Sequence, residues 1–294
     1  MRIVALASIV LGWGGLTLLY SAAVTGRARR SPTAPNYRGA ELPLTLGGGL
    51  ILLVFWVNAF RARWFIDSSV HTSAAQRLVI AASLLVVFLV GWFDDHRARS
   101  TRGIRGHLKE LAGGRVTTGV VKLIGIVGAA AWVSLSLTDG LVRILLGIPV
   151  IAGSANLWNM LDVRPGRALK FFLIAALVLV GWYARYDDFL LGAAIGSAAA
   201  LLTFDLRERA MLGDAGANLL GFIIGLALFR ILPTWGLAVP LVAILILHAL
   251  GETITLSRII EATPPLRWFD RLGRLPLDQA NRESTPPTPD SSAT

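Results

Sequence analysis

The chain has 294 residues, of which 54% are hydrophobic and only 16% are charged, and its mean hydropathy is +0.64. This balance is too apolar for a water-soluble domain of that length, so the sequence predicts an all-α integral membrane protein that crosses the bilayer several times. The net charge of +10 does not indicate nucleic-acid binding, because most of the basic residues lie in the connections between apolar segments.

Nine apolar segments are candidates for membrane-spanning helices, since a span needs roughly 20 apolar residues and fewer where neighbouring helices shield an end. In chain order they cover about 2–23, 42–60, 77–93, 116–136, 141–158, 170–186, 188–204, 217–232 and 236–254. The first segment also has the small residues of a signal-peptide cleavage site. Three arginines follow it at once, which is more typical of a membrane span.

The basic residues predict the orientation of these spans. Five stretches that would lie on one side contain 20 of the 28 Lys and Arg residues: 24–41, 94–115, 162–170, 205–216 and 255–294. The positive-inside rule therefore predicts a multi-pass protein of the cell membrane, with its N-terminus outside and its C-terminus in the cytoplasm.

Carboxylates stand at the cytoplasmic ends of the predicted spans. Asp94 and Asp95 end the third span, and Asp214 precedes the eighth in the segment Met211-Leu-Gly-Asp-Ala-Gly. Neighbours on a helix point about 100° apart, so Asp94 and Asp95 would have different partners. Asp214 also suits a helix N-cap, and an isolated Asp-Asp pair is typical of a solvated helix end. Together the three carboxylates indicate a metal site that acts on phosphate.

The composition limits which metal such a site would bind. The chain contains no cysteine and only four histidines, so oxygen atoms would have to supply the ligands. Oxygen ligands favour Mg²⁺, with Mn²⁺ as the alternative, over zinc.

Other polar residues interrupt the apolar segments. Asn156, Asn159 and Asp162 are spaced i, i+3, i+6 and would form a stripe on the fifth span, facing protein, a cavity or a ligand. Lys122 lies about two turns inside the fourth span. It would either reach back to the membrane surface or point into the cytoplasmic cavity and meet a phosphate.

The C-terminal residues depart from the apolar pattern. After two prolines, apolar residues recur at Leu266, Phe269 and Leu272, so the sequence predicts a short interfacial helix at about 265–274 on the inner leaflet. The last residues, 276–294, are rich in Pro, Ser and Thr and predict a disordered cytoplasmic tail. The transmembrane domain is thus expected to cover 1–275.

The order of these motifs resembles that of the polyprenyl-phosphate N-acetylhexosamine-1-phosphate transferases, the family of MraY and WecA. The resemblance runs from about residue 30 to 230. It rests on five segments: residues 35–48, which include Asn36 and Arg38, then Gly91–Asp95, Lys122, Asn156–Gly166 and Met211–Gly221.

The resemblance implies an MraY-like bundle with its active site at the cytoplasmic face. Its reaction would be the Mg²⁺-dependent transfer of a sugar 1-phosphate, of the N-acetylated hexosamine type, from a UDP-sugar to polyprenyl phosphate. UMP would be released, and the product would serve cell-envelope glycan assembly. By the same resemblance, Asp94, Asp95 and Asp214 would be catalytic, and Asp214 and Asp94 would bind the metal. The implied substrate-binding residues are Asn36, Arg38, Lys122, Asn156, Asn159 and Asp162.

Two features depart from the family pattern. Pro165 stands where the family usually has a second aspartate after Asp162, and the His-rich inner loop and the span after it are replaced by Arg258–Arg274. We hypothesise that Arg164, Arg167 and Lys170 take over phosphate binding.

Two other classes of function also fit parts of the sequence. A non-catalytic relative would bind polyprenyl phosphate or a nucleotide sugar and regulate envelope synthesis. A transporter would be expected to show repeats and polar residues near the midplane rather than at one face. The expected partners are the lipid phosphate, the nucleotide-sugar donor and the membrane, with no nucleic acid, and a homodimer is left open.

Overall fold

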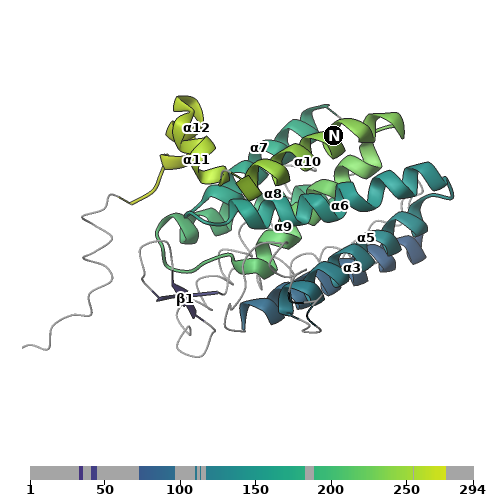
Figure 1. Cartoon of the computed structure of the whole chain (residues 1–294), viewed down its shortest axis with the longest axis horizontal. Coiled ribbons are helices and arrows are strands. Elements are labelled where there is room, and N and C mark those ends of the chain that lie inside the picture. The colour runs from purple at the N-terminus through teal and green to yellow at the C-terminus, as the bar shows by residue number, and fades with distance from the viewer. Residues whose placement is uncertain are drawn as a thin grey trace, which may run out of the picture.

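The computed structural model describes residues 33–35, 41–44, 73–96, 110, 113, 117–182, 189–253 and 255–275. These residues are mostly helical (Figure 1), which agrees with the predicted all-α class. The exception is an antiparallel pair of short strands, β1 (Thr33–Pro35) and β2 (Glu41–Pro43), with Ala34 opposite Leu42. Because β2 occupies the first residues of the predicted span at 42–60, that boundary was wrong.

The described part of the chain contains the following helices in chain order. They are α3 (Ala74–Asp95), α5 (Thr118–Leu137), α6 (Leu141–Leu161), α7 (Arg167–Trp182), α8 (Phe189–Leu206), α9 (Gly213–Ile231), η2 (Trp235–Leu237), α10 (Ala238–Thr253), α11 (Leu256–Ala262) and α12 (Pro264–Arg271). Local sequence explains two of the starts. Ser73 and Gln76 form a capping box before α3, and the Thr117 side chain accepts a hydrogen bond from Val120 N before α5.

Within the described residues, four helices are long and apolar enough to cross a membrane: α3, α5, α6 and α9. They match the predicted spans at 77–93, 116–136, 141–158 and 217–232, and a fifth is added if α10 and α11 count as one bent span. Helices α7 (16 residues) and α8 (18 residues) match the predicted spans at 170–186 and 188–204 in position, but neither is among these four. The predicted span at 2–23 and most of the one at 42–60 lie outside the described residues. The count of nine is therefore not confirmed, whereas the membrane class is supported.

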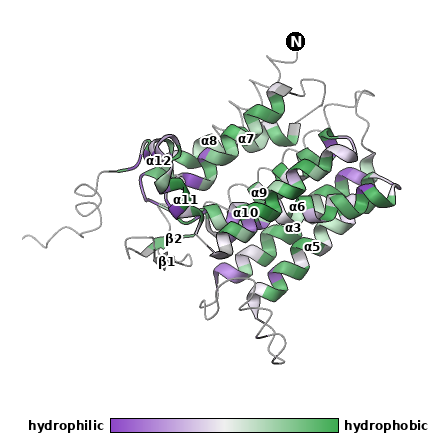
Figure 2. Ribbon diagram, turned by 45° about the horizontal axis from the view of Figure 1, so that its top comes forward, coloured by the Kyte–Doolittle hydropathy of each residue, from purple (hydrophilic) through white to green (hydrophobic). Residues whose placement is uncertain are grey.

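Helix α9 is the centre of the bundle. It is buried along nearly its whole length and packs against α3, α6, α7 and α8. Its Gly221 and Gly225 let it approach α6 closely, because an added Cβ would lie 2.7 Å from the Cα of Ala155 and 2.6 Å from the Cα of Ile151. Around it, Figure 2 shows helices coloured mainly as hydrophobic. Large apolar side chains on them, such as Ile124 and Leu145, are exposed.

The chain direction brings four helix ends together. Helix α6 runs back along α5 after a short connection, and α9 crosses α6 in the opposite direction, since Gly221 meets Ala155 while Gly225 meets Ile151. The end of α3, the start of α5, the end of α6 and the start of α9 thus lie at one end of the bundle. This arrangement agrees with the expectation that the motifs converge on one face.

Candidate active site at the ends of three helices

Three helices place charged side chains against one another at this end of the bundle. Asp94 comes from the last turn of α3, Lys122 from the second turn of α5, and Asp214 from the first turn of α9. The Lys122 ammonium donates to Asp94 Oδ2 at 2.7 Å and to Asp214 Oδ2 at 2.6 Å. We call these three residues the carboxylate–lysine cluster.

The cluster is largely withdrawn from solvent. The exposed fractions of the side chains are 13% for Lys122, 12% for Asp94 and 10% for Asp214. An unpaired charge at such depth would be costly, whereas a paired one is tolerated. The Lys122 ammonium therefore points inward to two carboxylates rather than to the membrane surface, and its predicted contact with a phosphate stays a prediction.

Asp95 has a different task from Asp94, as the 100° rule for neighbours on a helix predicted. Its carboxylate accepts hydrogen bonds from the backbone N–H groups of Asp214, at 2.8 Å, and Ala215, at 3.0 Å. These groups lie in the first turn of α9 and have no partner inside the helix. Asp95 from α3 therefore satisfies the start of α9, and Asp214 lies in the first turn of that helix rather than at the N-cap position that the sequence also suited.

Two glycines make this close approach of α3 to α9 geometrically feasible. Gly213 has a φ of +71°, and a Cβ there would lie 2.7 Å from Asp95 Oδ2. A Cβ at Gly91 would lie 2.6 Å from the Cα of Ala215. Gly91 and Gly213 therefore allow the two helices to pack backbone to backbone, which holds Asp214 beside Lys122.

The predicted polar stripe on α6 has partners of its own. The Asn156 amide lies 2.8 Å from His248 Nε2 on α10, whose Nδ1 lies 2.8 Å from Ile244 O. With Nδ1 donating to that carbonyl, Nε2 accepts from the Asn156 amide. Asn159 is half-buried, and Asp162 occupies the C-cap of α6 at the same end of the bundle as the cluster.

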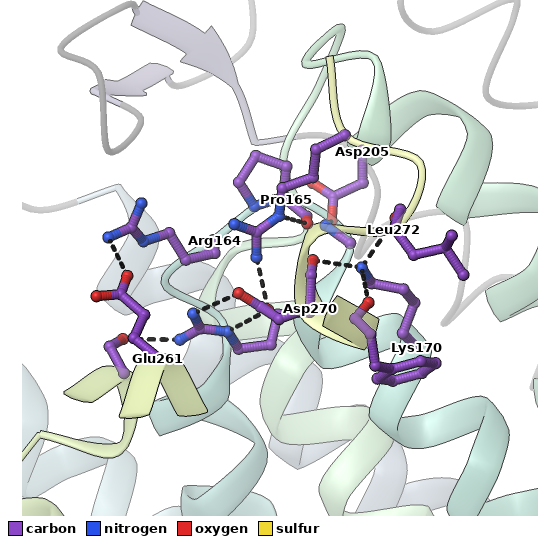
Figure 3. A network of polar contacts seen from close by, with 12 residues as sticks. Arg164, Pro165, Lys170, Asp205, Glu261, Asp270 and Leu272 are labelled. Atoms are coloured by element: carbon purple, nitrogen blue, oxygen red, sulfur yellow. Dashed lines mark hydrogen bonds and ion pairs between the residues drawn. The ribbon is translucent and has the colours of Figure 1, made fainter. Parts of the chain in front are cut away.

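The basic residues after Asp162 are paired with groups of the protein itself. Arg164 forms a partly exposed ion pair with Glu261 at 3.2 Å. Arg167 is fully buried, donates to both oxygens of Asp270 at 2.7 and 2.9 Å, and donates to Ser257 Oγ at 2.7 Å. Because its guanidinium is committed to these partners, among them the Asp270 carboxylate labelled in Figure 3, we leave Arg167 out of the proposed substrate site.

Asn36 and Arg38, which the sequence assigned to substrate binding, fall outside the described residues. Sequence reasoning also missed Asp205 and Asp270, two carboxylates buried near the turn after α6. Asp205 accepts from Gly166 N at 2.7 Å, and Asp270 pairs with Arg167. The available signal was only that each acid stands in or beside an apolar helical segment, where a carboxylate needs a partner or water.

A comparison with known protein families matches the part of the chain that contains the cluster. The family model described as glycosyl transferase family 4 matches residues 77–231, slightly more than half of the 294 residues. The matched segment begins in α3 and ends with α9, so it contains the whole carboxylate–lysine cluster and Asp95. No curated protein matches the chain significantly.

Proposed function

The chain belongs to glycosyl transferase family 4, and from this premise we propose that it transfers a sugar 1-phosphate from a UDP-sugar to polyprenyl phosphate, with release of UMP. The sugar would be of the N-acetylated hexosamine type. The observation that carries the proposal is the pairing of Lys122 with Asp94 and Asp214 at the ends of three apolar helices. A lipid phosphate at the membrane boundary would meet these groups there.

The cluster has the chemistry to bind Mg²⁺ with a phosphate substrate. It contains one more carboxylate than ammonium groups, and oxygens of both carboxylates lie within hydrogen-bond distance of one cation, the Lys122 Nζ. Among the described residues there is no group of three or more acidic or His side chains that could hold a metal alone. Mg²⁺ commonly uses one or two carboxylates and completes its shell with water and substrate phosphates. Asp94 and Asp214 fit that role.

In the proposed reaction, a phosphate oxygen of the lipid attacks the β-phosphorus of the UDP-sugar. The bond from that phosphorus to the oxygen bridging the two phosphates breaks, and UMP leaves with that oxygen. Bound Mg²⁺ would neutralise charge on the diphosphate. Lys122 would hold a phosphate oxygen, Asp94 and Asp214 would orient the reacting groups, and Asp95 would keep Asp214 in place. Phosphoryl transfer depends mainly on such positioning and charge neutralisation.

Direct attack by the lipid agrees better with this geometry than an aspartyl-phosphate intermediate. Asp94 and Asp214 are already ion-paired with Lys122, and Asp95 accepts two backbone hydrogen bonds. A carboxylate whose lone pairs are engaged in this way is a weakened nucleophile. The lipid phosphate needs no such activation step on the protein.

The direct test is to incubate the purified protein with polyprenyl phosphate, Mg²⁺ and a panel of nucleotide sugars, and to measure nucleotide monophosphate release. We expect UMP with a UDP-N-acetylhexosamine and none after chelation of the metal, with Mn²⁺ as a partial substitute. If no donor releases a nucleotide while the lipid still binds, the non-catalytic relative is the correct reading and the proposed activity is refuted.

Changing the carboxylates tests the assignment within that assay. Asp214→Asn and Asp94→Asn should each lower kcat/KM at least tenfold, because a charge-assisted contact contributes about 1.5–3 kcal/mol. Both variants should stay folded in detergent, since the amide has nearly the same size. Asp139→Asn, in the exposed connection before α6, is the matched control and should leave turnover unchanged. Near-normal turnover of Asp214→Asn would contradict the metal role.

A further inference from the structure

Buried polar groups fix the rotational orientation of α12 on the bundle. Asp270 on α12 receives the bidentate Arg167 contact, and Arg274 Nη2 lies 2.6 Å from Asp270 Oδ1. The Lys170 ammonium donates to the last carbonyls of the helix, those of Phe269 (2.9 Å), Asp270 (2.6 Å) and Leu272 (3.1 Å) (Figure 3). The contacts of Arg167 and Lys170 come from the start of α7, so the opposite face of α12 must point away from α7.

The inward face of α12 is the apolar one that the sequence assigned to the leaflet. Leu266 packs against the core, and the Phe269 ring meets Phe171 edge to face, with 5.7 Å between ring centroids. Spacing at i, i+3 predicts that an apolar stripe is covered, but it does not tell whether protein or lipid covers it. Here the bundle covers Leu266 and Phe269, and Leu272 alone of the three is exposed.

The outward face of α12 combines arginines with large apolar side chains. Arg267, Trp268, Arg271 and Leu272 are exposed, and Trp268 and Leu272 keep 67% and 49% of their surface. They line an open groove of about 490 Å³, completed by Pro264 and Gly273. None of the lining residues belongs to the carboxylate–lysine cluster. We call Arg267, Trp268, Arg271 and Leu272 the basic–aromatic face.

The contacts of α12 place this face at the edge of the membrane. Arg274 Nε donates to the carbonyl of Pro165, at 3.2 Å, and α12 is anchored on Arg167 and Lys170. These three residues lie in the turn after α6 and in the first turn of α7. Helix α6 is long and apolar enough to span the membrane, so its end marks the boundary with water. Figure 1 shows α11 and α12 at that end of the bundle.

We propose that the basic–aromatic face binds the headgroups of anionic phospholipids in the surrounding bilayer. Arg267 and Arg271 supply planar donors that suit a phosphate, and basic residues beside a span are attracted to an anionic leaflet. Trp268 is the residue type that settles at headgroup depth, because its ring is apolar and its N–H is polar. The interaction is separate from the proposed transfer reaction and does not depend on it.

A fluorescent label on the face can report which lipid lies beside it. The chain has no cysteine, so Leu272→Cys gives a single labelling site. The full-length protein is placed in phosphatidylcholine nanodiscs that contain the same mole fraction of either nitroxide-bearing phosphatidylglycerol or nitroxide-bearing phosphatidylcholine. We expect stronger quenching by the anionic lipid. The preference should fall about fivefold for each arginine removed in Arg267→Gln and Arg271→Gln, and it should fall in high salt.

Two controls separate the face from general attraction to the protein's positive charge. Arg258→Gln removes an exposed arginine of α11 outside the face and should leave the preference unchanged. A label at Leu141→Cys, at the other end of the bundle, should be quenched equally by both lipids. Equal quenching at position 272, or a label shielded from both lipids by a second copy of the chain, would overturn the proposal. If an arginine variant does not fold, the proposal is still tested by the Leu272→Cys protein alone, whose preference for the anionic lipid must fall in high salt.

Discussion

At the scale of single residues, the carboxylate–lysine cluster shows how a lysine is accommodated inside an apolar helix. Lys122 carries one positive charge and shares it between two carboxylates from other helices, at 2.7 and 2.6 Å. A cation at this point is needed for stability as well as for chemistry, because the two acids would otherwise repel each other in a poorly solvated site. The stability of the cluster should therefore depend on any other cation that binds between Asp94 and Asp214.

Replacing that ammonium should make the fold dependent on an added cation. Lys122→Met keeps most of the side-chain volume but leaves Asp94 and Asp214 unpaired, at a cost of about 3–5 kcal/mol. We expect a lower Tm in detergent, and millimolar Mg²⁺ should raise the Tm of this variant more than that of the unmodified protein. Arg164→Met, which breaks the exposed pair with Glu261, is the control and should cost at most about 1 kcal/mol without a Mg²⁺ response. Equal Mg²⁺ shifts in both variants would count against a cation site.

Sequence reasoning located the members of the cluster but not all of their tasks. Asp94, Lys122 and Asp214 could be selected because a charge beside an apolar run needs a partner or water. The capping of α9 by Asp95 could not, because Asp95 and Asp214 are 119 positions apart and only the packing of two helices joins them. The pairing of Arg167 with Asp270, across 103 positions, was missed for the same reason, and Arg167 was assigned to phosphate instead.

At the scale of elements, the crossing of α9 over α6 sets where Asp214 lies. Gly221→Ala should be strongly destabilising, since the new Cβ would overlap the backbone of Ser154 and Ala155, and overpacking costs about 1–3 kcal/mol. Gly128→Ala is the matched control, because nothing lies within 4 Å of a Cβ there, and alanine favours a helix by up to about 1 kcal/mol. Thermal unfolding in detergent measures both. A similar Tm for the two variants would show that α9 does not cross α6 this closely.

The docking of α12 should depend on pH through Asp270. Burial works to raise the pKa of this carboxyl, but the hydrogen bonds and charge of Arg167 and the charges of Arg274 and Lys170 outweigh it, so the pKa lies below its ordinary value. A carboxylate with a lowered pKa stabilises the fold fully above its unfolded pKa of about 3.9 and loses this contribution as the pH falls through the folded value. The contribution of Asp270 to docking should thus be constant above about pH 5 and weaken below about pH 4.

Hydrogen exchange of the α12 amides, corrected for the intrinsic rate at each pH, measures this docking. Asp270→Asn should show faster exchange already at neutral pH and no further change below about pH 4. Acid sensitivity that persists in Asp270→Asn would assign the effect to another group. A variant at the exposed Trp268, such as Trp268→Ala, should leave the pH dependence as it is, because its side chain takes no part in the anchor.

At the scale of the whole molecule, the sequence predicted the class, the order of the motifs and their convergence, because hydropathy and charge report directly on the membrane. Helix lengths were less predictable. The predicted span at 170–186 became a helix that already begins at Arg167, and the preceding turn is held by Asp205 and by Arg274, which follows the C-terminal helix. Such long-range anchors decide where a span begins, and no local pattern contains them.

The orientation of the bundle in the membrane is the remaining prediction at this scale. In the described part of the chain, basic residues follow α6 and α8 and lie in α11 and α12, at the end that holds the cluster. This end should therefore face the cytoplasm, together with Arg105 and the tail after Pro276, while Asp139 and Asp187 should lie outside. Asp139 and Glu261 are exposed at opposite ends of the described bundle, which suits single-cysteine labelling. In intact cells, an impermeant maleimide should label Asp139→Cys and spare Glu261→Cys, and inverted vesicles should show the reverse. Strong labelling at position 261 from outside would place the carboxylates on the external face, where UDP-sugars made in the cytoplasm would not reach them.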